Sequence, residues 1–227
     1  YSMVLFTWGE TYVPVKNMTH GFKFNETAKS YGFRDGDIPL RTDTRTFKSF
    51  DSNETVGDMY RGISEARHVV VWRGGKEVTL SLPGNLNMLD MMKANPRFVL
   101  PRVPFVVDSV KAGSPAMKAG MRRGDRVVAL NGKPVSDWND YTYRMGQLSD
   151  QLTHLNEAQA DRLRNVQLVV AHAGGSLDTM RVQLDADLLL GVYNQAPDYQ
   201  TVTRHYTFLE SIPAGISHGW NVLTGYV

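Results

Sequence analysis

The chain has 227 residues, and its 42% hydrophobic content is enough for two hydrophobic cores of ordinary domain size. Its 25 basic and 23 acidic residues are interspersed and give a formal net charge of +2, which argues against nucleic-acid binding. Cysteine is absent, so disulfide bonds are excluded, and no apolar run reaches the ~18 residues that a membrane-spanning helix needs.

The first part of the chain predicts a small domain of strands and two helices. After an apolar segment over residues 1–9, the predicted elements are a strand at 11–16, a helix near 26–31, a strand from 38, a helix near 55–64 and a hairpin over 68–82. Pro83-Gly84-Asn85 then breaks the pattern. We therefore place the first domain at residues 10–87.

A second set of elements begins near Met88. Residues 105–110 are rich in β-branched side chains and predict a strand. A helix is expected from Ser136 or Asp137, and four large side chains share one of its faces: Trp138, Tyr141, Met145 and Leu148. Residues 149–165 continue as a helical insert without a counterpart in the first domain, and a second hairpin spans 166–184. The second domain is thus expected at 88–192, followed by a segment at 193–227.

One short sequence cassette occurs twice. Ala28–Leu40 returns as Ala116–Val128, and each copy predicts a short helix, a glycine at its C-terminus, and a Gly-Asp turn that opens a strand. A Gly-Gly hairpin follows each copy. Self-similarity on this scale indicates a duplicated domain.

The second copy resembles a known family. Residues 114–135 read S-P-A-M-K-A-G-M-R-R-G-D-R-V-V-A-L-N-G-K-P-V, which is similar to the most recognisable segment of a PDZ domain; the first copy keeps the glycines and the Gly-Asp but lacks the Asn-Gly turn. The resemblance implies an α+β fold with two PDZ-like domains, each a small antiparallel β-barrel or sandwich with two helices.

Two consecutive PDZ-like domains resemble the extracytoplasmic insert of bacterial site-2 proteases, the intramembrane zinc metalloproteases of the regulator of sigma-E family. The apolar start with Trp8 and the amphipathic pattern of 206–227 resemble membrane-proximal segments of that family. The resemblance implies a periplasmic loop of an inner-membrane protein. It also implies that zinc is held in the parent's membrane domain, with no cofactor and no metal site in this chain.

A PDZ domain binds an extended peptide as an added strand between an edge strand and a helix. By this resemblance, the groove of the second domain would involve these residues: Arg97, Phe98, Val99, Leu100, Trp138, Tyr141 and Met145. Pro96 and Pro101 remove two N–H donors from this loop, which weakens the prediction of carboxylate capture. Core packing is the alternative role for Phe98–Leu100 and for the helix side chains.

The chain carries no H-E-x-x-H motif, and the G-x-S-x-G match at 215–219 has no acid or histidine after it, so no catalytic residue is assigned. The resemblance implies a tandem PDZ region that gates substrate entry by size in regulated intramembrane proteolysis. The alternative is a module that captures the newly exposed C-terminus of a first-cleavage product. In either case the expected partner is a single-pass membrane protein such as an anti-sigma factor after its first cleavage.

Overall fold

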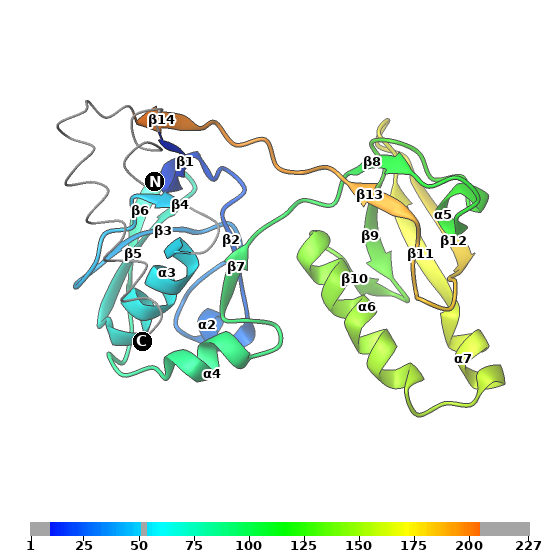
Figure 1. Cartoon of the computed structure of the whole chain (residues 1–227), viewed down its shortest axis with the longest axis horizontal. Helices are drawn as coiled ribbons and strands as arrows, with labels where there is room; N and C mark the ends of the chain where they lie inside the picture. Colours follow the sequence, from blue (N-terminus) through cyan, green and yellow to red (C-terminus); the bar gives the residue numbers. More distant parts are fainter. Residues whose placement is uncertain (1–9, 51–53, 205–227) are drawn as a thin grey trace, which may run out of the picture. The chain divides into compact units, whose positions relative to one another are not determined.

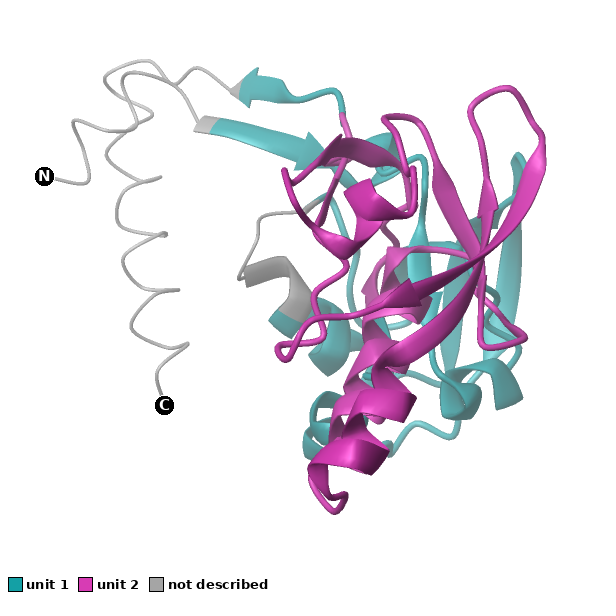
Figure 2. Ribbon diagram, turned by 90° about the vertical axis from the view of Figure 1, so that its right-hand side faces the viewer, with its two compact units in different colours: residues 1–99, 199–227 teal, residues 100–198 magenta. Residues whose placement is uncertain are grey.

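The computed structural model describes residues 10–50 and 54–204, which form two compact units. Unit 1 comprises residues 1–99 and 199–227, and unit 2 comprises residues 100–198 (Figures 1 and 2). Unit 2 is therefore an insertion in the chain of unit 1. Each unit has its own cluster of buried apolar side chains.

Unit 1 is built from three small sheets and three α-helices within the described residues. Its elements are β1 (Glu10–Pro14), a 3₁₀ turn (Val15–Asn17), β2 (Phe22–Phe24), α2 (Glu26–Ser30), β3 (Ile38–Thr42), β4 (Ser49–Phe50), α3 (Glu54–Glu65), β5 (His68–Arg73), β6 (Lys76–Ser81), α4 (Met88–Lys93), β7 (Val99–Pro101) and β14 (Val202–Arg204). The sheet orders are β3-β5-β6, β2-β7 and β14-β1-β4.

Unit 2 repeats much of this order and adds helical length. Its elements are β8 (Val107–Val110), α5 (Pro115–Lys118), β9 (Arg126–Leu130), β10 (Lys133–Pro134), α6 (Trp138–Leu152), α7 (Glu157–Arg164), β11 (Asn165–Ala171), β12 (Leu177–Gln183) and β13 (Val192–Asn194). One sheet has the order β10-β9-β11-β12, and β13 pairs with β8. The insert predicted at 149–165 as a continuing helix is helical but interrupted: α6 ends at Leu152, and α7 begins at Glu157 after a capping box at Asn156.

The two cassettes adopt the same local structure. Gly32 and Gly36 have φ values of 96° and 95°, and Gly120 and Gly124 have values of 84° and 87°. All four lie in the left-handed region where a side chain is strained. The predicted sequence of helix, glycine turn and strand is therefore present in both units.

Each cassette ends in a buried aspartate that receives a basic side chain from the following hairpin. Arg73 donates two hydrogen bonds to Asp37, both at 2.7 Å, and in unit 2 the Nδ1 atom of His172 lies 3.0 Å from Asp125 Oδ1. Arg73 also donates to the Gly32 carbonyl at 2.8 Å. These contacts tie the hairpin to the turn in each unit.

Unit 1 extends past the boundary predicted at residue 87, because it also contains α4 and the first residue of β7, Val99. Met91, Phe98 and Val99 are buried in the core of unit 1. The Asn25 N–H donates to the Phe98 carbonyl at 3.2 Å, so this segment completes the β2–β7 sheet of unit 1. The Pro-Gly-Asn break at 83–85 marks a turn inside unit 1 rather than its end.

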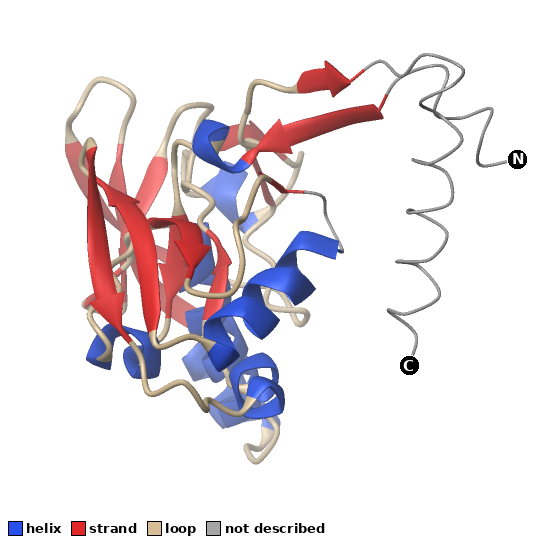
Figure 3. Cartoon of the chain, turned by 90° about the vertical axis from the view of Figure 1, so that its left-hand side faces the viewer, coloured by secondary structure: helices blue, strands red, loops and turns tan. Residues whose placement is uncertain are grey.

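The predicted boundary at 192–193 also differs from the structure. It divides β13, and residues 193–198 belong to unit 2, whereas 199–204 return to unit 1. There β14 pairs with β1, with Thr203 opposite Thr11 (Figure 3).

Of the expected membrane-proximal segments, residues 1–9 and the part of 193–227 from residue 205 onward lie outside the described residues. Within residues 10–50 and 54–204, none of the helices combines the length and apolar character required to cross a bilayer.

Candidate peptide-binding groove

Among the described residues, β13 of unit 2 pairs with β8 on one side and with no strand on the other. The Lys111 N–H donates to the Gly191 carbonyl at 2.8 Å, and Tyr193 is the partner of Ser109 two residues further along the same register. Because successive residues of a strand direct their backbone groups to opposite sides, the N–H and C=O of Val192 point away from β8. This edge can accept an added strand.

The helix α6 forms the opposite wall. It begins at the buried Asp137, whose side chain accepts from the Asp140 N–H at 2.8 Å and from Arg102 Nε at 3.0 Å. This cap is the physical reason that the helix starts here. Trp138 and Tyr141 then pack on each other with ring centroids 5.2 Å apart.

Phe105 completes the aromatic cluster at this end of the helix, with its ring 5.1 Å from that of Tyr141 and perpendicular to it. Tyr141 is only 6% exposed, and burial raises its pKa. The cluster fixes the position of α6 beside β13.

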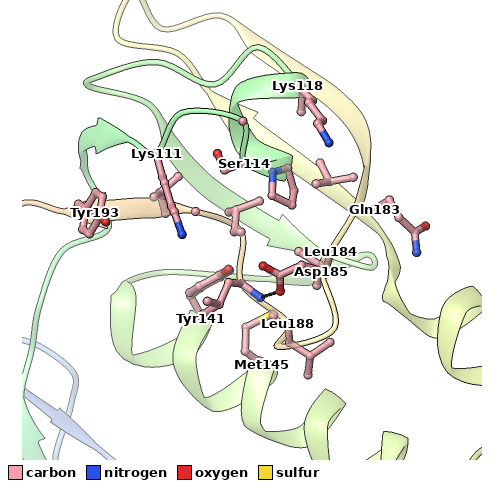
Figure 4. Close-up of a pocket in the computed structure, with 18 of the residues that line it drawn as sticks. Lys111, Ser114, Lys118, Tyr141, Met145, Gln183, Leu184, Asp185, Leu188 and Tyr193 are labelled. Atoms are coloured by element: carbon pink, nitrogen blue, oxygen red, sulfur yellow. Dashed lines mark hydrogen bonds between the residues drawn. The ribbon is translucent and has the colours of Figure 1, made fainter.

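A cavity of about 960 Å³ lies between these elements and continues around the loop before β13. Its apolar walls include Tyr141 and Met145 of α6 together with Leu188 and Leu190 of the loop (Figure 4). Lys111, Lys118, Arg181 and Asp185 contribute charged groups. The site is thus an apolar hollow beside an unpaired strand edge, with charges at its margin.

The corresponding place in unit 1 is filled by the unit's own tyrosine. The Tyr60 hydroxyl, on α3, donates to the Val99 carbonyl at 2.7 Å and accepts from the Val99 N–H at 3.4 Å. These are the backbone groups of β7 that face away from β2, because the Phe98 carbonyl faces β2. Tyr60 is 1% exposed, and burial raises its pKa.

Met145 has the equivalent position on α6. Tyr60 precedes the buried Ile63 by one helical turn, as Met145 precedes the buried Leu148. Methionine has no hydroxyl to bond the strand edge. The edge is therefore occupied in unit 1 and open in unit 2.

The predicted site residues separate into two groups. Trp138, Tyr141 and Met145 line the cavity of unit 2. Arg97, Phe98, Val99 and Leu100 do not: Phe98 and Val99 are buried in unit 1, Arg97 is exposed and Leu100 is half-buried. Assigning these four residues to the groove of the second domain was wrong, because their strand pairs with β2 of the first unit.

The loop that the prediction missed is Asp185–Gly191. It follows the second Gly-Gly hairpin and leads into β13, as the segment after α4 leads into β7 in unit 1. Extending the repeat to the end of each unit would have identified it. Among the described residues, no group of three or more His, Asp or Glu side chains is arranged to hold a metal ion.

Two comparisons with known proteins bear on this site. Residues 106–149 match the family model for the PDZ domain. A 40-residue segment is 42% identical to a protein of Neisseria meningitidis serogroup A that is named as a candidate zinc metalloprotease; the match covers 18% of this chain and 9% of that protein. The PDZ resemblance read from residues 114–135 is thereby confirmed. Within unit 2, residues 106–149 are thus similar to a PDZ domain.

Proposed function

We propose that this chain is a non-catalytic substrate-recognition region of a site-2-type zinc metalloprotease, and that unit 2 binds an extended segment of the substrate between α6 and β13. The PDZ match and the partial similarity to a bacterial zinc metalloprotease support the family. By the same proposal, unit 1 is a second domain of the PDZ type, because its strand order and its cassette parallel those of unit 2.

The observation that carries the proposal is the open edge at Val192 beside the cavity. Addition of a strand satisfies the Val192 N–H and C=O and places alternate side chains toward the apolar wall at Met145. The zinc ion and the catalytic groups then belong to parts of the protease outside this chain. The substrate is a single-pass membrane protein, such as a trimmed anti-sigma factor, presented on the periplasmic side.

Met145→Lys tests this function. The substitution places a charge in the apolar wall of the cavity, and we expect it to abolish peptide binding measured by fluorescence anisotropy. Met117→Lys is the matched control, since Met117 is 47% exposed and does not line the cavity. Equal affinities of the two variants for a peptide that binds the wild-type chain would contradict the assignment of the groove.

Control of substrate entry by size is the second candidate function, and the filled edge of unit 1 favours it. With Tyr60 bonded to Val99, unit 1 adds volume, but its strand edge at β7 is already occupied. In the full-length protease, this function predicts that deleting residues 10–204 permits cleavage of untrimmed substrate, whereas Met145→Lys does not. If Met145→Lys alone abolishes cleavage of trimmed substrate, peptide capture is the better account.

A further inference from the structure

The loop before β13 contains its own carboxylate. The Leu189 N–H donates to Asp185 Oδ1 at 2.7 Å, and the Leu188 N–H donates to the Asp185 carbonyl at 3.1 Å. Leu188 has a φ of 59°, so the chain turns sharply between Asp185 and the strand. Asp185 is held by this hydrogen bond at the wall of the cavity (Figure 4).

This position matters because a free C-terminal peptide needs its carboxylate bound by backbone N–H groups of such a loop. In this loop, the Leu189 N–H already donates to an internal carboxylate. A second carboxylate brought beside Asp185 would meet a like charge and would compete with it for the Leu189 N–H. The loop is therefore poorly suited to a free C-terminus.

The cavity also does not stop at the loop. Its lining continues on the far side to Lys118 of α5 and to Gln183 at the end of β12 (Figure 4), and it also includes Arg181. A peptide lying along β13 therefore has room to continue past the loop. A pocket that receives a chain terminus would instead be closed at this point.

Lys111, Lys118 and Arg181 have the opposite effect, because their cationic groups also line the cavity and attract anions. All three side chains are exposed and have no ion-pair partner among the described residues. The Asp185 carboxylate, by contrast, is fixed by a short hydrogen bond. A carboxylate that approaches the Leu189 N–H therefore meets the Asp185 carboxylate that already accepts from it.

We infer that the groove of unit 2 recognises an internal extended segment of an apolar polypeptide, rather than a free C-terminal carboxylate. The inference rests on the proposed function, since it concerns the same groove. In this reading, Asp185 is a specificity-determining residue that disfavours chain termini. The substrate chain passes over the loop between α5 and β12.

Peptides that differ only in their ends test the inference. A random heptapeptide library is displayed on phage in two formats, one ending in a free carboxylate and one followed by a Gly-Ser tail, and selected against the whole chain. Each enriched sequence is then synthesised as the free acid, as the amide and with the tail. We expect the amide and the tailed peptide to bind about tenfold more tightly than the acid, the factor that corresponds to about 1.4 kcal/mol.

Asp185→Asn identifies the cause, because asparagine keeps an oxygen for the Leu189 N–H but removes the charge. We expect this variant to bind the acid and the amide equally, while Asp187→Asn leaves the wild-type ratio unchanged. Asp187 is in the same loop but does not line the cavity, and Lys111 is present in all three proteins.

The remaining outcomes contradict either the inference or the proposed function. If the acid binds more tightly than the amide in the wild type, the groove binds C-termini: the inference fails and the proposed function stands. If the ratio is the same in Asp185→Asn as in the wild type, Asp185 is not the cause and the inference fails. If no peptide is enriched in either format, the proposed function fails, and the inference with it.

Discussion

Replacing Tyr60 by phenylalanine should measure how strongly unit 1 holds its own strand edge. The change removes one hydroxyl and leaves the ring in the core. The Val99 N–H and C=O then lose their partner in a site where Tyr60 is 1% exposed. Leaving buried backbone groups unsatisfied costs about 1–3 kcal/mol. With a central value of about 2 kcal/mol and roughly 4 °C per kcal/mol for a domain of this size, unit 1 should melt about 8 °C lower.

Calorimetry of the whole chain and amide exchange at Val99 are the measurements. Tyr31→Phe is the control, because Tyr31 also packs against the core of unit 1 but its hydroxyl has no hydrogen-bond partner among the described residues. We expect Val99 to lose protection only in Tyr60→Phe. Unchanged protection at Val99, with melting temperatures that match in the two variants, would refute the idea that Tyr60 occupies the edge.

Three further predictions concern stability. Asp37→Asn should destabilise unit 1 by about 3 kcal/mol, because the buried carboxylate loses its charge-paired bonds from Arg73; a calorimetric loss below about 1 kcal/mol would be too small. Gly120→Ala should lower the free energy of unfolding in urea by about 1 kcal/mol, because its φ is 84° and the space around it is open. Gly191→Ala should lower it by more, because its φ is 82° and an added Cβ would collide with the Ser114 side chain. Equal losses in the two variants would argue against this collision. Burial by itself would raise the pKa of Asp35, but a backbone N–H and two lysines outweigh it and hold the pKa below its usual value. The stabilisation by the ionised Asp35 is therefore present above about pH 4 and is lost as the pH falls through the lower folded-state pKa. The difference in unfolding free energy between wild type and Asp35→Asn should shrink from about pH 5 to pH 2. A constant difference over that range would contradict the lowered pKa of Asp35.

The features that the sequence determined are local. The glycines at 120 and 124, the start of α6 near 136–137 and the apolar face of α6 each depend on residues a few positions apart, and the structure has them where the pattern predicts. The same dense local pattern led to the resemblance to a PDZ domain, and the family model matches residues 106–149. Turn and cap chemistry involves only near neighbours, so it can be read without knowledge of the fold.

Strand pairing and the state of each groove depended on the tertiary structure. Phe98 joins β2 and Val192 joins the β8–β13 sheet, pairings between segments far apart in sequence that no periodicity encodes. Tyr60 and Met145 look alike as residues on an apolar helix face. Only the packing shows that one hydroxyl reaches a strand edge, whereas the thioether leaves the other edge open, because that difference depends on a few ångströms between elements that the local sequence does not specify.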